Sequence, residues 1–518
     1  MSVNGALHEA LIAAPLLLPA VMAAATLLFW RRHRMVGAGL SIAGTVGLCG
    51  IALALMTRTQ DGTVSAYALG DWAAPFGIVL VLDRLSAMML MLTALLALAV
   101  VCHAVLTGLD RKGWHFHPLF QFQLLGLNGA FLTGDLFNLF VFFEVLLIAS
   151  YGLMLHGQGK ERLQAGVQYV VVNLVGSVLF LIAIGMLYGI TGTLNMADMA
   201  LRIAELPPGD QGLLRAGALL LIAVFALKAA LLPLHLWLPR AYAGAAPTVA
   251  ALFAIMTKVG AYSIIRTTTL MFGDDAGAAA WAPGTYMLPA ALLTMVLGFA
   301  GLVAARGLRD MAAFGVIGST GTLLVAIALF DETAMAAALY YLPHTTLAAA
   351  MLFLVTDCAA RGRGKLGGAI IPGPQWAGAG PVAAFYLLAA IALAGLPPLS
   401  GFIGKLLILK AALPLHGAAW VWGVVLGTSL LAMVGLARAG STVFWKVAPD
   451  SGPVSPSAAR NAPWMLAPAA SLLALLVLFT VLSGPATEYA QASAEQLFAP
   501  QSYIDAVLTP AEREKQAP

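Results

Sequence analysis

Four ionisable side chains stand inside long apolar runs of the sequence, where charge is expensive. One is a carboxylate, as in Leu139-Phe-Val-Phe-Phe-Glu144, and three are amines, as in Phe402-Ile-Gly-Lys405. A charged group at the centre of a bilayer costs a few kcal/mol even on lenient insertion scales. We therefore expect these residues to have a function. The four are Glu144, Lys228, Lys258 and Lys405.

The chemistry that suits this set is proton transfer. Apolar surroundings disfavour the charged form of a lysine, and a nearby carboxylate favours it. If Glu144 approaches or leaves Lys228, the proton affinity of the lysine changes with that motion. Imidazole titrates near neutral pH, so His235 and His344 are candidate relays. Such groups, joined by water, predict a proton path that can be gated.

Each of these residues also has a structural alternative. Glu144 and Lys228 could form a static ion pair that fixes the register of two helices, and Lys258 could be static in the same way. Lys405 could hydrogen-bond carbonyls freed by the Pro-Pro sequence before it. Both histidines stand beside prolines and could cap open backbone instead.

Other polar residues are expected at the membrane surface. Arg266 falls near a helix end and is expected to extend to the headgroups. Asp83 and Arg84 are neighbours and are expected to form an interfacial pair. Three histidines fall near one predicted loop, where solvation is a better expectation than a metal site: His103, His115 and His117.

No pattern in the sequence predicts a cofactor or a metal site. Gly404-Lys405 resembles a nucleotide-binding loop, but Leu399 stands at the first glycine position and Leu406 replaces Ser/Thr. The cysteines occur singly, without metal-ligand or disulfide spacing; they are Cys49, Cys102 and Cys358. An ion gradient or a partner must therefore supply the energy.

The composition indicates that lipid surrounds these side chains. Of the 518 residues 61% are hydrophobic and 10% are charged, and the mean hydropathy is +0.91. A soluble domain keeps about a quarter of its residues charged. The net charge of +4 is scattered, so no nucleic-acid partner is expected.

The apolar runs predict an all-α integral membrane protein with about 14 transmembrane helices, since a span needs about 20 residues. They are expected at 6–30, 35–57, 77–107, 114–134, 135–156, 163–190, 213–238, 245–270, 284–305, 309–330, 333–358, 380–413, 418–445 and 462–484. A polar tail follows the last one.

The basic residues of the loops predict the orientation. One set of alternate loops is strongly basic, and this set belongs in the cytoplasm. Both termini then lie outside a bacterial cytoplasmic (inner) membrane. The basic set is Arg31, Arg32, Arg34, Arg111, Lys112, Lys160, Arg162, Arg240, Arg306, Arg309, Arg361, Arg363, Lys365, Lys446 and Arg460.

Two spans are interrupted in similar ways, one at Lys228-Ala-Ala-Leu-Leu-Pro233 and one at Gly395-Leu-Pro-Pro-Leu-Ser400. Paired broken helices in two halves of a transporter indicate an inverted repeat with its site near the midplane. A third break is expected at Pro343, although its counterpart span has no proline. The predicted units are helices 1–3 (1–113), two five-helix repeats (114–270 and 284–445), and the last helix with its tail (462–518).

At these residues the chain resembles the antiporter-like subunits of respiratory complex I, membrane-bound hydrogenases and multisubunit Mrp-type antiporters. The resemblance rests on His235-Leu-Trp-Leu-Pro-Arg-Ala-Tyr, on Ala246-Pro-Thr-Val-Ala-Ala and on Thr257-Lys-Val-Gly-Ala-Tyr. It implies 14 helices with two inverted repeats. It also implies a proton path through Glu144, Lys228, Lys258 and Lys405, with His344 as the relay.

Within this group, Thr133-Gly-Asp-Leu-Phe-Asn-Leu-Phe-Val-Phe-Phe-Glu144 is similar to the fifth helix of the D-type subunits of Mrp (Mnh, Pha) antiporters. The resemblance implies a proton-translocating subunit of a Na⁺(K⁺)/H⁺ antiporter, acting with the other subunits and not as an enzyme. The alternatives are a proton pump module of an NADH–quinone oxidoreductase or hydrogenase, and a purely structural subunit.

Overall fold

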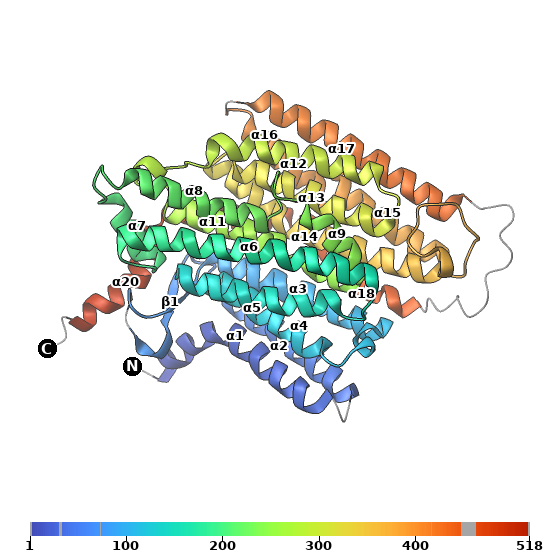
Figure 1. Cartoon of the computed structure of the whole chain (residues 1–518), viewed down its shortest axis with the longest axis horizontal. Coiled ribbons are helices and arrows are strands. Elements are labelled where there is room, and N and C mark those ends of the chain that lie inside the picture. Colours follow the sequence, from blue (N-terminus) through green and yellow to red (C-terminus); the bar gives the residue numbers. More distant parts are fainter. Residues whose placement is uncertain (1–2, 31–33, 73, 416, 447–462, 516–518) are drawn as a thin grey trace.

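The protein is a bundle of long helices that run roughly parallel to one another (Figure 1). The structure, a computed structural model, describes residues 3–30, 34–72, 74–415, 417–446 and 463–515. Of the basic loop residues, Arg31, Arg32 and Arg460 lie outside this described part. We call the end where α1 begins and α20 ends the terminal end (left in Figure 1), and the opposite end the basic end.

The helices of the first half are α1 (Val3–Trp30), α2 (Arg34–Arg58), α3 (Arg84–Thr107), α4 (Phe116–Leu132), α5 (Leu136–Leu155), α6 (Lys160–Thr191), α7 (Met196–Ala204), α8 (Gln211–Lys228), α9 (Trp237–Gly244), α10 (Pro247–Phe253) and α11 (Met256–Leu270). The second half has α12 (Gly284–Ala304), α13 (Leu308–Ile327), α14 (Glu332–Gly362), α15 (Ala379–Ala394), α16 (Ser400–Ala412), α17 (Ala418–Gly440), α18 (Ala467–Val481), α19 (Ser483–Phe498) and α20 (Gln501–Lys515).

The chain is a multi-span membrane protein. Within the described residues, 12 helices are long and apolar enough to cross a membrane, and α15 is a shorter apolar helix. Twelve of the 14 predicted spans fall on these 12 helices, the span at 380–413 falls on α15 and α16, and the span at 114–134 falls on α4, which is shorter than the 12. Two segments outside the expected spans are also helical, namely α7 and the tail that forms α19 and α20.

Both expected breaks occur. The first separates α8, which ends at Lys228, from α9, which begins at Trp237; the second separates α15 from α16. The third expected break is wrong, because α14 continues through Pro343. A break that the sequence did not predict lies between α10 and α11, two residues before Lys258. The pairs α8–α9 and α15–α16 leave backbone carbonyls whose partners are side chains, whereas Ala254 and Ile255 between α10 and α11 keep backbone hydrogen bonds to Ala251 and Leu252.

Side chains inside the bundle satisfy the open backbone at the first break. The indole of Trp237 donates to the carbonyl of Leu227 at 3.0 Å, and Thr294 on α12 accepts from the amide of Leu232 at 2.8 Å. Unpaired backbone groups are costly in hydrocarbon, so irregular backbone at membrane depth has to be buried in protein. These contacts let the break persist beside Lys228.

The third span begins later than expected, because a β-hairpin precedes it. Strand β1 (Ser65–Ala68) pairs antiparallel with β2 (Val79–Leu82) at the terminal end. Asp83 then starts α3 as its N-cap, accepting from the amide of Ser86 at 2.8 Å. Carboxylate caps of this kind are strongly preferred at helix starts.

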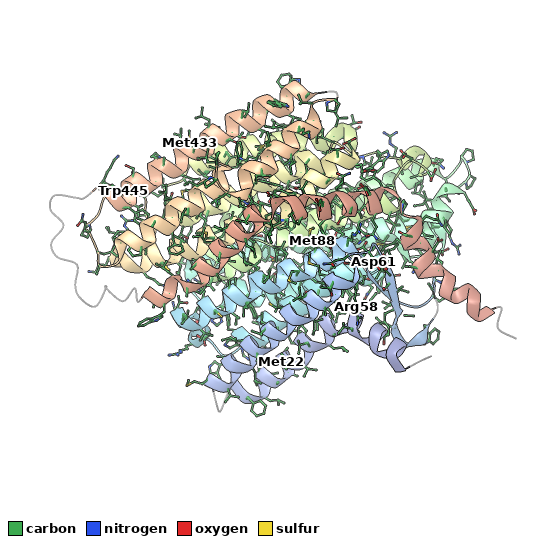
Figure 2. All side chains as sticks on the ribbon, turned by 180° about the vertical axis from the view of Figure 1, so that it is seen from behind. Met22, Arg58, Asp61, Met88, Met433 and Trp445 are labelled. Carbon is green, nitrogen blue, oxygen red and sulfur yellow. The ribbon has the colours of Figure 1, made fainter. Side chains whose placement is uncertain are left out.

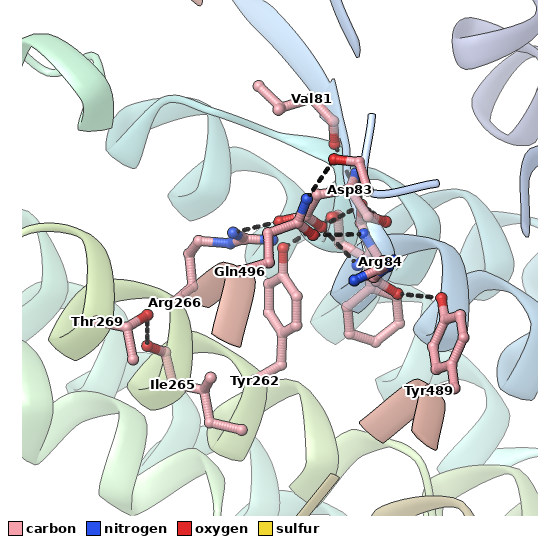
Figure 3. A network of polar contacts seen from close by, with 12 residues as sticks. Val81, Asp83, Arg84, Tyr262, Ile265, Arg266, Thr269, Tyr489 and Gln496 are labelled. Carbon is pink, nitrogen blue, oxygen red and sulfur yellow. Dashed lines mark hydrogen bonds and ion pairs between the residues drawn. The ribbon is translucent and has the colours of Figure 1, made fainter. Parts of the chain in front are cut away.

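Asp83 also pairs with Arg266, which corrects two expectations (Figure 3). The two charges are 2.6 Å apart and are 2% and 4% exposed, so Arg266 does not extend to the headgroups. Arg84 instead donates to the backbone carbonyls of Thr59, Gln60 and Ala492. The ion pair therefore joins the start of α3 to the end of α11, the helix that carries Lys258.

At the basic end, two of the three loop histidines are buried, contrary to expectation. His103 contacts the hydroxyl of Thr248 at 2.9 Å and lies 3.9 Å from Asp357, and His117 lies 3.5 Å from Asp110. The described residues contain no cluster of three or more His, Cys, Asp or Glu with metal-site geometry. His103 joins α3 to α10 and α14, and His117 joins α4 to the short helical turn Leu109–Lys112 that follows α3.

Candidate proton path

Glu144 lies in the middle of α5 and faces α6. The hydroxyl of Ser177 on α6 contacts its carboxylate and also lies 3.1 Å from the carbonyl of Asn173 on its own helix, and its single proton can be donated to one of these two acceptors at a time. A hydroxyl donor favours the charged form of a carboxylate in an apolar setting. The side chain is half-buried, so it keeps some access to its surroundings.

Lys228 is the last residue of α8, at the edge of the first break, and is 5% exposed. Its amine donates to the amide oxygen of Asn173 on α6 at 3.0 Å. Glu144 lies near enough to act on it electrostatically, yet no ion pair within 4 Å joins the two, although both are described. The static ion pair considered from the sequence is therefore not formed.

A glycine and an aromatic ring lie beside this lysine. A Cβ on Gly176 would lie 3.6 Å from the Lys228 amine and 3.0 Å from Leu227. The ring of Phe143 is 5.9 Å from the same amine, within cation–π range. One neutral amide, one aromatic face and a carboxylate beyond direct contact therefore surround Lys228.

Lys258 lies on α11, two residues after the unexpected break, and is 0% exposed. Its amine donates to the hydroxyls of Thr257, at 3.3 Å, and of Thr320 on α13, at 3.4 Å. Thr320 also donates to Thr257 at 3.3 Å. No carboxylate forms an ion pair with Lys258 in the part of the chain that the structure describes. When a lysine that is paired with a carboxylate loses its proton, it leaves the carboxylate as an unpaired buried anion. Lys258 is held by hydroxyls alone, so the loss of its proton leaves no such anion.

Further hydroxyls lie between α13 and α14, within the second half. Thr322, two residues after Thr320 on α13, lies close to Tyr341 on α14, and so does Thr345. The ring of Tyr341 is 5.6 Å from the ring of His344. Polar side chains thus extend from α13 to α14 through an otherwise apolar interior.

His344 lies on α14, is 1% exposed and contacts both sides of the second break. Its Nε2 is 3.1 Å from the carbonyl of Ala392, and its Nδ1 is 2.8 Å from the hydroxyl of Ser400. A carbonyl only accepts, so Nε2 carries a proton, and Nδ1 of the neutral ring accepts from Ser400. His344 therefore caps open backbone and keeps a basic nitrogen within a hydrogen bond of a hydroxyl.

Lys405 lies on α16, just after the second break, and is 4% exposed. Its amine donates to the carbonyl of Ala394 at 2.7 Å and to the hydroxyl of Ser429 on α17 at 2.8 Å. The capping contact considered from the sequence is thus present. The second bond, and the ring of Phe299 at 5.6 Å, connect the amine to α17 and α12.

These residues lie on helices that pack against one another in succession. Contacts join α5 to α6, α6 to α8, α8 to α11, α11 to α13, α13 to α14, and α14 to α16. His235 differs from the others: it lies in the open segment between α8 and α9, is partly exposed, and its Nδ1 has no hydrogen-bond partner among the described residues. Five of the six predicted residues therefore lie on successively packed helices, and we call these five the row; His235 hydrogen-bonds to none of them.

The sequence did not single out the neutral partners of the row: Ser177, Asn173, Thr257, Thr320, Ser400 and Ser429. The spacing of Asn173 and Ser177, one helical turn apart on α6, is the one signal that could have found them.

A polar cavity of about 690 Å³ also lies at the basic end, where α6, α9 and α13 meet. Arg240, Arg309 and Asp310 line it.

Comparisons with known proteins identify the family. A family model described as NADH:quinone oxidoreductase/Mrp antiporter, TM, matches residues 133–433, which include every residue of the row. The chain belongs to this family.

Relatives and solved structures agree over nearly the whole chain. A probable K⁺/H⁺ antiporter D-type subunit of Rhizobium meliloti is 39% identical, covering 96% of this chain and 97% of the relative. A Na⁺/H⁺ antiporter D-type subunit of Alkalihalophilus pseudofirmus is 36% identical, over 96% and 99%. A chain of the Mrp complex from Dietzia sp. superposes with a TM-score of 0.84 at 28% identity, covering 98% of this chain and 100% of that one.

Proposed function

We propose that this chain is the proton-translocating membrane subunit of a multisubunit monovalent cation (Na⁺ or K⁺)/H⁺ antiporter, a transporter subunit and not an enzyme. The observation that carries the proposal is the row from Glu144 to Lys405. Its amines are buried, are held by neutral partners, and lie beside breaks in their helices. The family membership and the D-type antiporter relatives support the same function.

Protons move along the row in the proposed mechanism. Glu144 and Lys228 exchange a proton as their separation changes, Lys258 receives it at the middle, and His344 passes it to Lys405. A buried ammonium without an ion-pair partner is costly, so each lysine gives up its proton readily to the next group. Asn173, Thr320, Ser400 and Ser429 hold the groups in place between transfers.

The metal cation takes another route in this proposal. Na⁺ and K⁺ prefer oxygen ligands, and Glu144 is the one carboxylate of the row. The cation path therefore lies elsewhere in the assembled complex, and this chain alone is inactive. Its partners are the other antiporter subunits, the two ions and the surrounding lipid.

The membrane arrangement is part of the proposal. The basic end faces the cytoplasm of a bacterial inner membrane, as positive charge in short loops favours, and both termini lie outside. Fourteen crossings follow if α4 and the pairs α8–α9, α10–α11 and α15–α16 each count as one. The helices from α4 to α11 and from α12 to α17 then form two inverted repeats.

Everted vesicles test the function, prepared from cells that lack their own sodium antiporters and express the complete set of subunits. An imposed pH gradient is followed by addition of Na⁺ or K⁺ and by dequenching of a pH-sensitive dye. We expect cation-dependent collapse in wild type, loss in Lys228→Ala, and no change in Lys446→Ala, an exposed lysine. Acidification driven by NADH or hydrogen, without a cation response, would instead favour a redox pump.

A further inference from the structure

The polar cavity between α6, α9 and α13 gives water a position close to the start of the row. It lies at the basic end, which is on the right in Figure 1 and on the left in Figure 2, where Trp445 is labelled. Glu161 on α6 and Arg240 on α9 line it and are exposed, so the cavity opens to the surface. Charged and polar walls of this kind hold water, and this end faces the cytoplasm in the proposed orientation.

Tyr169 on α6 lies between this cavity and the row. It stands one helical turn after Ala165, which lines the cavity, and one turn before Asn173, which accepts from the amine of Lys228. Residues four apart lie on the same face of a helix. Tyr169 is 1% exposed and does not itself line the cavity. A proton that moves along this face of α6 between the cavity water and Lys228 therefore passes Tyr169.

The hydroxyl of Tyr169 is held so that its oxygen stays open to a donor. It lies 2.9 Å from the hydroxyl of Ser150 on α5, and Ser150 donates to the carbonyl of Leu147 at 2.6 Å. Each hydroxyl has one proton, so Ser150 accepts from Tyr169 in this arrangement. The other contact of the phenol is the sulfur of Met256 at 3.8 Å, and no described residue donates to the phenol oxygen. This oxygen can therefore accept a proton from water.

Aromatic rings fill the space around this hydroxyl. The ring of Tyr169 lies 5.4 Å from the rings of Tyr151 on α5 and Trp237 on α9, and 6.2 Å from the ring of Phe253. Trp237 and Phe253 are 3% and 0% exposed. Closely packed rings exclude a continuous column of water. The phenol hydroxyl is therefore the group that can carry a proton through this layer.

The inner side of the layer leads to both groups that start the row. Tyr151 lies two helical turns after Glu144 on α5 and is near enough to act electrostatically with its carboxylate. The indole of Trp237 donates to the carbonyl of Leu227, the residue before Lys228. The rings around Tyr169 thus separate the cavity from the Glu144–Lys228 pair.

We propose that Tyr169 is a further residue of the proton path, and that its hydroxyl passes protons between the cavity water and the Glu144–Lys228 pair. This role rests on the proposed function of the chain in proton translocation. In each transfer the phenol oxygen accepts one proton from water on one side and releases its own proton to water on the other. The phenol is neutral before and after, and rotation of the hydroxyl restores its bond to Ser150. Ser150 is a positioning residue that sets the direction of this hydroxyl between transfers.

Removal of the hydroxyl in the complete antiporter complex tests the proposal, in everted vesicles whose outer face is cytoplasmic. Tyr169→Phe keeps the ring and its packing. The matched control is Tyr386→Phe on α15, because Tyr386 is 2% exposed and its hydroxyl also contacts a methionine sulfur, while it donates to the carbonyl of Leu436. We expect cation-driven proton flux to fall about a hundredfold in Tyr169→Phe, the lower end of what a positioned proton-transfer group contributes. Tyr386→Phe should keep the wild-type flux, and both variants should keep the wild-type content of complex.

Two further readouts separate a proton relay from a structural role of Tyr169. The ratio of flux in H₂O to flux in D₂O should rise in Tyr169→Phe, because passage of the proton through the ring layer becomes rate-limiting. Ser150→Ala should have no further effect in the Tyr169→Phe background, since Ser150 acts through the lost hydroxyl. Wild-type flux in Tyr169→Phe, or a lower flux with an unchanged isotope ratio, would overturn the proposal and leave the row untouched. Absence of cation-driven flux in wild type would instead refute the proposed function.

Thiol labelling tests the cavity as the access point, in a chain whose native cysteines are replaced by alanine. Ala165→Cys places a thiol on the cavity wall, whereas Val167→Cys lies on the opposite face of α6, where Val167 is 55% exposed and does not line the cavity. A charged thiol reagent outside the everted vesicles should label Ala165→Cys at least about tenfold faster, because hydrocarbon excludes charge, and should lower its flux. Equal labelling of the two variants, or labelling of Ala165→Cys without loss of flux, would overturn the proposal.

Discussion

Replacing Lys405 separates its two possible roles, proton carrier and backbone cap. The amine donates to the carbonyl of Ala394 at 2.7 Å and to Ser429 at 2.8 Å. Lys405→Met keeps the length of the side chain and removes both donors and the titratable group. If the residue carries protons, the proton flux should fall strongly while the content of assembled complex falls little.

The structure gives a magnitude for each effect. Ser429 keeps its bond to the carbonyl of Val425 at 2.7 Å, so Lys405→Met leaves one buried carbonyl unpaired, at a cost of about 1–3 kcal/mol. Without the amine, a proton that crosses this segment meets a barrier of about 3 kcal/mol. This is the cost of a charge at the centre of a membrane on the insertion scales that give the lowest values. Such a barrier slows transfer about a hundredfold.

The assay measures proton flux in everted vesicles, driven by Na⁺ or K⁺, and measures complex content on native gels in the same membranes. Lys446→Met, at an exposed position, controls for the loss of a lysine. We expect near-normal complex content with flux about a hundredfold lower in Lys405→Met. Wild-type flux per assembled complex in that variant would refute the proton role and leave the cap as the whole function of Lys405.

Two further substitutions test the support of the row. In Gly401→Ala the new Cβ would lie 2.5 Å from Nε2 of His344, so transport should fall in the vesicle assay, whereas Gly380→Ala, with nothing within 4 Å, should leave transport at the wild-type rate. Asp83→Ala leaves Arg266 buried and unpaired and should destabilise the complex by about 3–5 kcal/mol. Thermal melting of the purified complex measures this loss; a double variant with Arg266→Leu should recover part of it, and an unchanged melting temperature in Asp83→Ala would contradict the ion pair's role.

The sequence predicted the positions of the spans and the buried charges because both depend on hydropathy alone. A lysine such as Lys258 inside an apolar run stands out from composition. The paired breaks at Pro233 and at Pro397-Pro398 were also predictable, since proline interrupts helices through its own geometry. The break before Lys258 contains no proline in its two open residues, so nothing local indicated it.

The partners of the row were not predictable because they depend on which helix faces meet. Serine and threonine in apolar helices commonly bond to their own backbone, as Thr428 does with Val424, and nothing in the sequence distinguishes Thr320 from them. Arg266 was misinterpreted for the same reason. Its position near a helix end predicted that its side chain extends to the lipid headgroups. Instead, Asp83, which is far away in the sequence, pairs with Arg266 inside the bundle.

The central claim is that protons pass along the whole row, and Lys258 at its middle tests this claim most directly. Liposomes containing the complete complex and an internal pH-sensitive dye would be given a Na⁺ or K⁺ gradient, and proton flux compared between wild type, Lys258→Met and Lys446→Met. Thr257 and Thr320 can still bond to each other in Lys258→Met, so the complex should assemble. We predict no cation-driven proton flux in Lys258→Met and normal flux in Lys446→Met. Normal flux in Lys258→Met would show that protons do not travel this row.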